Sequence, residues 1–195
     1  GLKWSARSLF WDHRPMKIII LDRDGVINED SDTYIKSPGE WIPIPGSLEG
    51  IARLNHGGYR VVVASNQSGL ARGLFTIDDL NAMHRKMHRE LARVGGQVES
   101  TFFCPHGPDD DCRCRKPRPG LFEQISYRLR KDLTFTPAVG DSLRDIEAAL
   151  TVGAAPILVL TGNGRKTLRS LSRAVMQRVQ VFKDLSAVAD ALVAG

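Results

Sequence analysis

The sequence predicts a single α/β domain built on a parallel β-sheet with helices on both faces. Three observations lead to this prediction. Short β-branched runs alternate with helical patterns along residues 16–195, and such alternation produces parallel strands joined by right-handed crossovers. Residues 18–21 are all apolar, as expected for a strand covered on both faces. The chain has 195 residues, which is the size of one domain.

The expected elements follow one another in regular order. Strands are predicted at residues 17–21, 60–64, 98–103, 138–140, 156–160 and 180–182. A helix is predicted at residues 47–56, where apolar residues recur at helical spacing before a Gly-Gly pair. Thr76 is expected to cap a long amphipathic helix that a second Gly-Gly pair ends. Further helices are predicted around residues 121–129 and 143–150, with a closing helix at 184–193.

Composition excludes several classes of protein. The chain is 42% hydrophobic and 25% charged, which excludes a largely disordered or collagen-like chain. The longest apolar runs lie at residues 18–21, 61–64 and 154–160, far shorter than the ~18 residues of a membrane span, so we expect no membrane partner. A net charge of +5 permits an anionic ligand without requiring nucleic acid. We expect a monomer.

The first fifteen residues differ from the rest. They lack the uninterrupted apolar core and the cleavage site of a secretory signal. We expect Met16 to be the natural start, residues 1–15 to be an N-terminal extension or cloning scar, and residues 16–195 to form the one domain. A short amphipathic arm carrying Trp4, Phe10 and Trp11 is the alternative.

Two carboxylates, Asp22 and Asp24, come directly after the first predicted strand. Because they repel each other, burying both calls for a positive charge between them, and Mg²⁺ with oxygen ligands is the simplest candidate. A pair of solvated loop acids explains the bare motif equally well. Ser65 and Asp141 follow later strands. Ligands of parallel sheets bind at the carboxyl ends of the strands, so we expect Asp22, Ser65, Cys104 and Asp141 along one rim.

All three cysteines lie between residues 104 and 114. An odd, clustered set argues against disulfides and indicates a reducing compartment, which we take to be the cytoplasm. Three thiolates and an imidazole suit tetrahedral Zn²⁺, and four protein ligands define a structural site; three unligated thiols are the alternative. Such a metal would stiffen the loop and fix the residues that follow it. The predicted ligands are Cys104, His106, Cys112 and Cys114.

The order of acid pair, hydroxyl, lysine and acid resembles the four signature motifs of the haloacid dehalogenase (HAD) superfamily; here these are Asp22 with Asp24, Ser65, Lys116 and Asp141. Residues 22–28 (DRDGVIN), 65–73 (SNQSGLARG) and the zinc loop are similar to its branch of heptose bisphosphate and histidinol phosphatases. The resemblance implies a HAD-like Rossmannoid sheet. It also implies no large cap domain, because no long insert occurs where larger members carry one.

The resemblance implies a Mg²⁺-dependent phosphatase that works through an aspartyl-phosphate. Asp22 would be the nucleophile, and Asp24 the general acid and then the general base. The Mg²⁺ ligands would be Asp22, the Asp24 backbone carbonyl and Asp141. The transferred phosphoryl group carries negative charge on its oxygens. The groups implied to neutralise it are the Ser65 hydroxyl, the Asn66 backbone N–H and Lys116.

The resemblance implies a small phosphorylated sugar as substrate: the 7-phosphate of a heptose 1,7-bisphosphate would be removed, for ADP-heptose and lipopolysaccharide core biosynthesis. Arg115 would hold the second phosphate. Histidinol phosphate is the first alternative, since Glu29, Asp30 and Asp32 could attract its amine. The implied substrate contacts are Asp30, Tyr34, Ser65, Asn66, Gln67, Ser68, Arg115, Lys116 and Ser142.

Weaker signals support other interpretations. The basic residues between 165 and 178 would suit a zinc-stabilised nucleic-acid-binding module or a DNA 3′-phosphatase, but a solvated basic helix face explains them more simply. His84 and His88 lie four apart on the long predicted helix. No third ligand accompanies them, and we expect ordinary helix residues that border the core. Asn163-Gly164 predicts a turn and no more.

Overall fold

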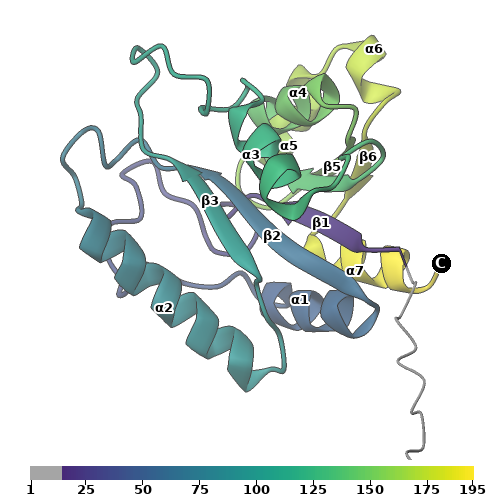
Figure 1. Ribbon diagram of the computed structural model, residues 1–195, viewed down its shortest axis with the longest axis horizontal. Helices are drawn as coiled ribbons and strands as arrows, with labels where there is room; N and C mark the ends of the chain where they lie inside the picture. The colour runs from purple at the N-terminus through teal and green to yellow at the C-terminus, as the bar shows by residue number, and fades with distance from the viewer. Residues whose placement is uncertain (1–14) are drawn as a thin grey trace, which may run out of the picture.

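The computed structural model describes residues 15–195, so the expectations for residues 1–14 lie outside it. One six-stranded sheet with the order β3-β2-β1-β4-β5-β6 runs through the molecule (Figure 1). Every pair of neighbouring strands is parallel, which confirms the predicted sheet. The strands are β1 (Lys17–Leu21), β2 (Tyr59–Asn66), β3 (Ser100–Cys104), β4 (Pro137–Gly140), β5 (Ala155–Val159) and β6 (Gln180–Phe182).

Helices cover both faces of the sheet, as predicted (Figure 1). Successive side chains of a strand point to opposite faces, and β1 supplies Ile19 and Leu21 to one core, Ile18 and Ile20 to the other. The first core includes α1 (Ser47–His56), α2 (Ile77–Arg93) and α7 (Leu185–Val193). The second core includes α3 (Gly120–Leu129) and α4 (Leu143–Thr151).

The long helix α2 forms for the reasons that its sequence indicates. Thr76 caps it: its hydroxyl accepts from the backbone N–H of Asp79, and the Asp79 side chain accepts from the backbone N–H of Thr76. This reciprocal capping satisfies two donors that a helix start leaves unpaired. Leu80, Met83 and Met87 are fully buried against the sheet. The position of α2 matters below, because α2 also carries His84.

The structure corrects three details of the sequence prediction. β3 begins at Ser100 rather than 98, because its pairing with β2 starts there, although Val98 is buried. β2 continues to Asn66, so Ser65 lies within the strand. The basic stretch interpreted above as one helix face forms two short helices, α5 (Gly164–Ser170) and α6 (Arg173–Met176).

Candidate active site

The carboxyl ends of the central strands meet along one edge of the sheet, and the predicted chemical groups gather there. Asp22 follows β1, Asn66 ends β2, and Asp141 follows β4. A cleft of about 280 Å³ opens at this edge. The predicted residues that line it are Asp22, Asp24, Asp30, Tyr34, Asn66, Gln67, Ser68, Arg115, Lys116, Asp141 and Ser142.

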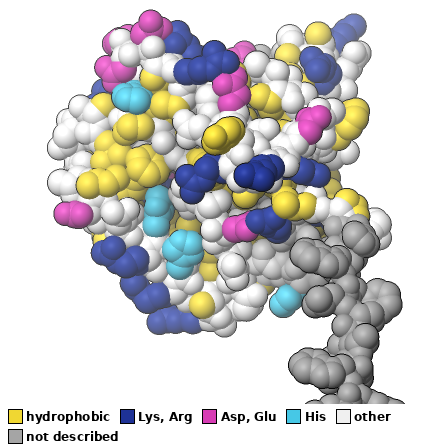
Figure 2. Space-filling view, viewed as in Figure 1, with side chains coloured by type: hydrophobic (Ala, Val, Ile, Leu, Met, Phe, Trp, Pro, Cys, Tyr) yellow, Lys and Arg dark blue, Asp and Glu magenta, His cyan; other side chains and the backbone are white. Residues whose placement is uncertain are grey.

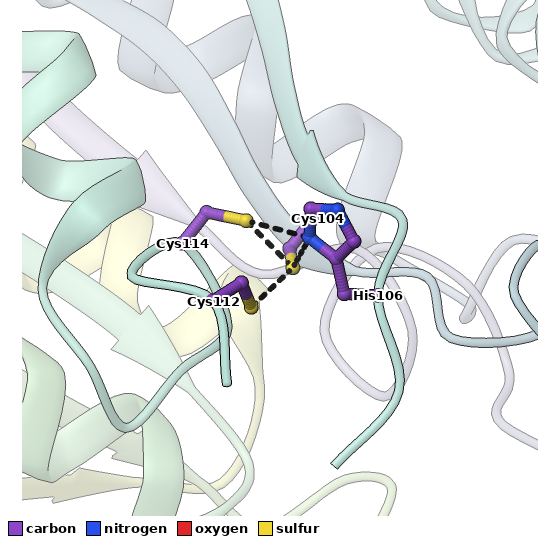
Figure 3. A group of neighbouring side chains, drawn as sticks. All are labelled: Cys104, His106, Cys112 and Cys114. Atoms are coloured by element: carbon purple, nitrogen blue, oxygen red, sulfur yellow. Dashed lines mark hydrogen bonds between the residues drawn. The ribbon is translucent and has the colours of Figure 1, made fainter. Parts of the chain in front are cut away.

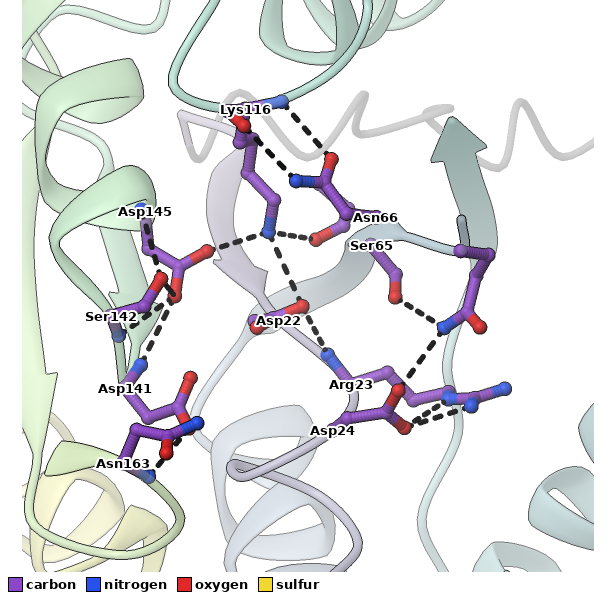
Figure 4. A network of polar contacts seen from close by, with 12 residues as sticks. Asp22, Arg23, Asp24, Ser65, Asn66, Lys116, Asp141, Ser142, Asp145 and Asn163 are labelled. Carbon is purple, nitrogen blue, oxygen red and sulfur yellow. Dashed lines mark hydrogen bonds and ion pairs between the residues drawn. The ribbon is translucent and has the colours of Figure 1, made fainter. Parts of the chain in front are cut away.

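Lys116 is a buried positive charge at the base of the cleft (Figure 4). Its Nζ donates to Asp145 Oδ1 at 2.7 Å and to the Ala64 carbonyl at 2.7 Å, and lies 3.2 Å from Asp22 Oδ1. Burial lowers the pKa of Lys116, but the charges of Asp145 and Asp22 outweigh it and raise the pKa above its usual value. The ammonium therefore stays charged and keeps one position.

Asp145 links Lys116 to the first turn of α4. Its Oδ2 accepts from the Ser142 hydroxyl at 2.9 Å and from the Ser142 and Asp141 backbone N–H groups at 3.1 Å each. Burial raises the pKa of Asp145, but Lys116 and these donors hold it below its usual value. Since Oδ1 accepts from Lys116, both oxygens of this carboxylate already have protein donors.

Asp141 packs between two glycines. Gly25 and Gly162 have φ angles of 84° and 54°, and a Cβ atom built on them would lie 2.1 Å and 2.3 Å from Asp141 Oδ2. The backbone N–H of Asn163 donates to the same oxygen at 2.9 Å. Burial and the charge of Asp145 raise the pKa of Asp141 to about 7. A nearby cation would favour its ionised form.

Three carboxylates are close enough to hold one cation: oxygens of Asp22, Asp141 and Asp145 lie within 4.8 Å of one another. Burial and the charge of Asp145 raise the pKa of Asp22 well above its usual value. Among the residues described, no donor reaches Asp22 Oδ2 or Asp141 Oδ1, whereas both Asp145 oxygens are engaged. Asp22 and Asp141 are therefore the carboxylates that fit a hard cation such as Mg²⁺.

Asp24 is held by three side chains. Its Oδ1 accepts from Arg23 Nε at 2.8 Å and from Asn28 Nδ2 at 2.9 Å, and its Oδ2 from Gln67 Nε2 at 3.3 Å. Arg23, completely buried between the two acids of the motif, was not singled out in the sequence. The available signal was a positively charged residue between the two acids, two positions after an apolar strand.

Asn66, the last residue of β2, is hydrogen-bonded to the backbone of Lys116 in the loop before α3. The Asn66 side chain donates to the Lys116 carbonyl at 3.1 Å and accepts from the Lys116 N–H at 3.0 Å. Ser65 is buried beneath the cleft rather than in its lining, and its hydroxyl accepts from Gln67 at 2.7 Å. A direct contact between Ser65 and a phosphoryl group stays a prediction.

Arg144 and Asn163 also line the cleft, and the sequence analysis gave neither a functional role. Asn163 was expected to mark only a turn, but its side chain also donates to Asp30 Oδ2 at 3.1 Å. The signal was its place shortly after β5, at the same edge of the sheet as the other strand ends. Arg144 lies in the first turn of α4, two residues from Ser142.

The predicted zinc ligands come together in the loop between β3 and α3 (Figure 3). A tetrahedral ion with bonds of about 2.3 Å to sulfur and 2.0 Å to nitrogen separates sulfur pairs by about 3.8 Å, and sulfur from nitrogen by about 3.5 Å. The Cys104 and Cys112 Sγ atoms are 3.6 Å apart, and His106 Nδ1 lies 3.5 Å from Cys104 Sγ and 3.3 Å from Cys114 Sγ. The Cys104 and Cys114 Sγ atoms are closer, at 2.8 Å, and would have to separate by about 1 Å around an ion. With that adjustment the four donors fit structural zinc.

The parallel sheet brings Asp22, Asp24, Lys116 and Asp141 together in one cleft at its edge. This arrangement defines a hydrolase of the HAD class. A family model described as HAD-hydrolase-like matches residues 113–188. A D-glycero-beta-D-manno-heptose-1,7-bisphosphate 7-phosphatase of Bordetella bronchiseptica is 59% identical over 177 residues, which cover 91% of this chain and 98% of that protein. The enzyme of the same name from Neisseria meningitidis is 50% identical over 87% of this chain and 91% of its own.

A solved structure agrees with these relatives. The D,D-heptose 1,7-bisphosphate phosphatase of B. bronchiseptica, complexed with magnesium and phosphate, matches with a TM-score of 0.88 and 58% identity, over 92% of this chain and 99% of its own. The chain therefore belongs to the D-glycero-beta-D-manno-heptose-1,7-bisphosphate 7-phosphatase family of HAD-like hydrolases. It is a phosphoric monoester hydrolase.

The zinc loop generates a first prediction. Lys116 and Arg115 follow Cys114 directly, so loss of the metal should let both side chains move. We expect Cys112→Ser, or a zinc-selective chelator in excess Mg²⁺, to lower phosphate release about 100-fold, the effect of misplacing a catalytic group by about 1 Å. Mg²⁺ binding, followed by calorimetry, should persist, and zinc should restore the chelated enzyme. Full activity in protein shown to be zinc-free would refute this coupling.

Proposed function

We propose that this protein removes the 7-phosphate of D-glycero-beta-D-manno-heptose 1,7-bisphosphate through an aspartyl-phosphate on Asp22. One observation carries the proposal: side chains from four separate segments, Asp22 with Asp24, Asn66, Lys116 and Asp141, line a single cleft. This is the arrangement that transfer of a phosphoryl group to a carboxylate requires.

The reaction has two steps. An Asp22 oxygen attacks phosphorus, the bond from phosphorus to the sugar oxygen breaks, and Asp24 gives its proton to that oxygen. Water then attacks the aspartyl-phosphate while Asp24 takes a proton from it, which releases inorganic phosphate and restores both carboxyl groups. Lys116, fixed against Asp22 and Asp145, neutralises charge on the transferring group in both steps.

Three oxygen ligands would hold Mg²⁺: the carboxylates of Asp22 and Asp141 and the backbone carbonyl of Asp24. The ion supplies positive charge to the phosphoryl oxygens when it is bound. The relative complexed with magnesium and phosphate supports this assignment. Zinc would be held by the Cys₃His cluster and would serve structure only, because four protein ligands leave no open position.

The substrate class is supported by the relatives and by the cleft. The relatives named above act, by their names, on the beta anomer of the heptose bisphosphate, which favours this substrate over histidinol phosphate. Arg115 and Arg144 line the cleft, and neither has a carboxylate partner among the residues described. Two unpaired guanidinium groups suit a second phosphate. The product would enter ADP-heptose and lipopolysaccharide core synthesis.

The interpretation as a nucleic-acid-binding module receives little support. Lys and Arg side chains on the face shown in Figure 2 form several separate groups, with acidic and apolar side chains between them. A nucleic-acid site needs a continuous basic surface. We therefore favour a small phosphosugar as the partner.

The helices, the cysteines and the cleft also bear on the cellular compartment and on the oligomeric state. None of the helices in residues 15–195 is long and apolar enough to cross a bilayer. The three cysteines form no disulfide, and zinc binding needs thiolates, which supports a reducing compartment, the cytoplasm. We propose that residues 16–195 act as one domain and as a monomer, since one chain supplies every group the reaction needs.

The nucleophile provides the central test. Asp22→Asn should lower phosphate release from the heptose bisphosphate by at least about 10³-fold, because an amide cannot form the acyl-phosphate. Substrate binding in the presence of Mg²⁺ should be weakened far less. A mutant that turned over normally would remove Asp22 from the mechanism. Side-by-side rates on the beta and alpha anomers and on histidinol phosphate would establish the preferred substrate.

Arg144 provides a test of the second-phosphate site. Arg144→Ala should raise the KM for the bisphosphate about 10-fold, since a charge-assisted hydrogen bond is worth about 1.5–3 kcal/mol. It should leave the KM for a heptose 7-monophosphate unchanged. Arg128→Ala, an exposed arginine on α3, is the matched control. Equal effects on both substrates would assign Arg144 another role.

A further inference from the structure

Arg23 connects the cleft to helix α2. The guanidinium is completely buried, and its Nε and Nη2 atoms each lie 2.8 Å from Asp24 Oδ1. Its remaining nitrogen, Nη1, lies 3.3 Å from Nε2 of His84 and 4.0 Å from the sulfur of Met83, both on α2. A buried guanidinium needs a partner for each of its edges, and α2 supplies the partners for the edge turned away from Asp24.

The contact with Arg23 fixes the chemical state of His84. A guanidinium has only donors, so His84 Nε2 must accept, and the imidazole is neutral with its proton on Nδ1. The charged or titratable groups that act on the ring are Arg23 and Asp24 from the loop after β1, and His88 from α2. Burial, with the charges of Arg23 and His88, lowers the pKa of His84 to about 4. The accepting form therefore persists at neutral pH.

These contacts make the two oxygens of Asp24 unequal. Oδ1 receives Arg23 and the Asn28 amide, whereas Oδ2 receives only the Gln67 amide at 3.3 Å. An oxygen already surrounded by donors cannot also carry a proton. The proton that Asp24 exchanges with substrate must therefore reside on Oδ2, and the orientation of the carboxyl group depends on where Arg23 is held.

We propose that His84 is a positioning residue for the reaction: its neutral imidazole holds Arg23, and Arg23 holds Asp24 with Oδ2 free for proton transfer. This rests on the proposed function, in which Asp24 protonates the leaving group. It assigns to α2, which supplies no lining residue to the cleft, control over the general acid.

The leaving group of the substrate distinguishes positioning from a general structural role. Departure of a sugar alkoxide needs the proton from Asp24, whereas p-nitrophenolate leaves without one. The value of kcat/KM reports the first step, transfer to Asp22. We expect His84→Ala to lower kcat/KM for the heptose bisphosphate about 10-fold to 100-fold, part of the ~10²–10⁴-fold that acid catalysis supplies. The value for p-nitrophenyl phosphate should change less than about twofold.

Two variants complete this experiment. His84→Gln keeps an oxygen that can accept from Arg23 and should recover most of the activity on the bisphosphate. His88→Ala alters an exposed histidine one turn further along α2 and should match the wild type on both substrates. Parallel loss on both substrates in His84→Ala, or unchanged rates on both, would overturn the proposal.

A stability measurement tests the same contact if His84→Ala does not fold. A histidine whose folded pKa is about 4 and whose ordinary value is 6.5 takes up its proton more readily when unfolded. Its contribution to stability is therefore present above pH 6.5 and is lost as the pH falls toward 4. The urea unfolding free energy should fall more steeply over this range in the wild type than in His84→Gln. Equal slopes would contradict a neutral His84 against Arg23.

A further variant separates this proposal from the proposed function. Asp24→Asn should lose turnover of the bisphosphate whatever occupies position 84. If Asp24→Asn keeps that turnover, the assignment of Asp24 as general acid is wrong. A second outcome is that Asp24→Asn is inactive while His84→Ala keeps the wild-type ratio of kcat/KM for the heptose bisphosphate to kcat/KM for p-nitrophenyl phosphate. In that case only the role of His84 is wrong.

Discussion

The burial of one ammonium group among carboxylates is the interaction on which the rest of the site depends. Oxygens of Asp22, Asp141 and Asp145 lie within 4.8 Å of one another, and like charges at such spacing repel. Lys116 offsets this repulsion by contacting Asp22 and Asp145 at once. Its loop is tied to the end of β2 by the two hydrogen bonds between Asn66 and the Lys116 backbone. We expect zinc in the adjacent Cys₃His cluster to add to this restraint.

Three aspartates that face the cleft share one pattern of hydrogen bonding. In Asp22, Asp24 and Asp141, one oxygen is engaged by strong protein donors, and the other has a weak donor or none. The engaged oxygen fixes the rotamer, so in the proposed reaction the free oxygen would meet metal or substrate without further ordering. Such preorganisation reduces the entropy that the reaction must otherwise overcome.

The sequence predicted the sheet, both helical layers and the rim of the cleft, because strand ends in a parallel sheet share one edge and local patterning identifies those ends. It also predicted the cluster of three cysteines and His106, which lie close together along the chain. It did not predict the contact of Arg23 with His84, which depends on where α2 lies relative to the segment after β1. Asn163 was missed for a related reason: its Asn-Gly pair has the local signature of a turn, and only the fold brings it to Asp141.

Asp22 and Asp24, the proposed nucleophile and general acid, are supported from opposite faces of the sheet. On the α4 side, the N-terminal turn of that helix holds Asp145, which holds Lys116 against Asp22. On the α2 side, His84 holds Arg23 against Asp24. Since the two apolar cores are separate, a packing change on one face should disturb the nucleophile or the acid without the other. The two supports meet in the short segment after β1, which carries both carboxylates.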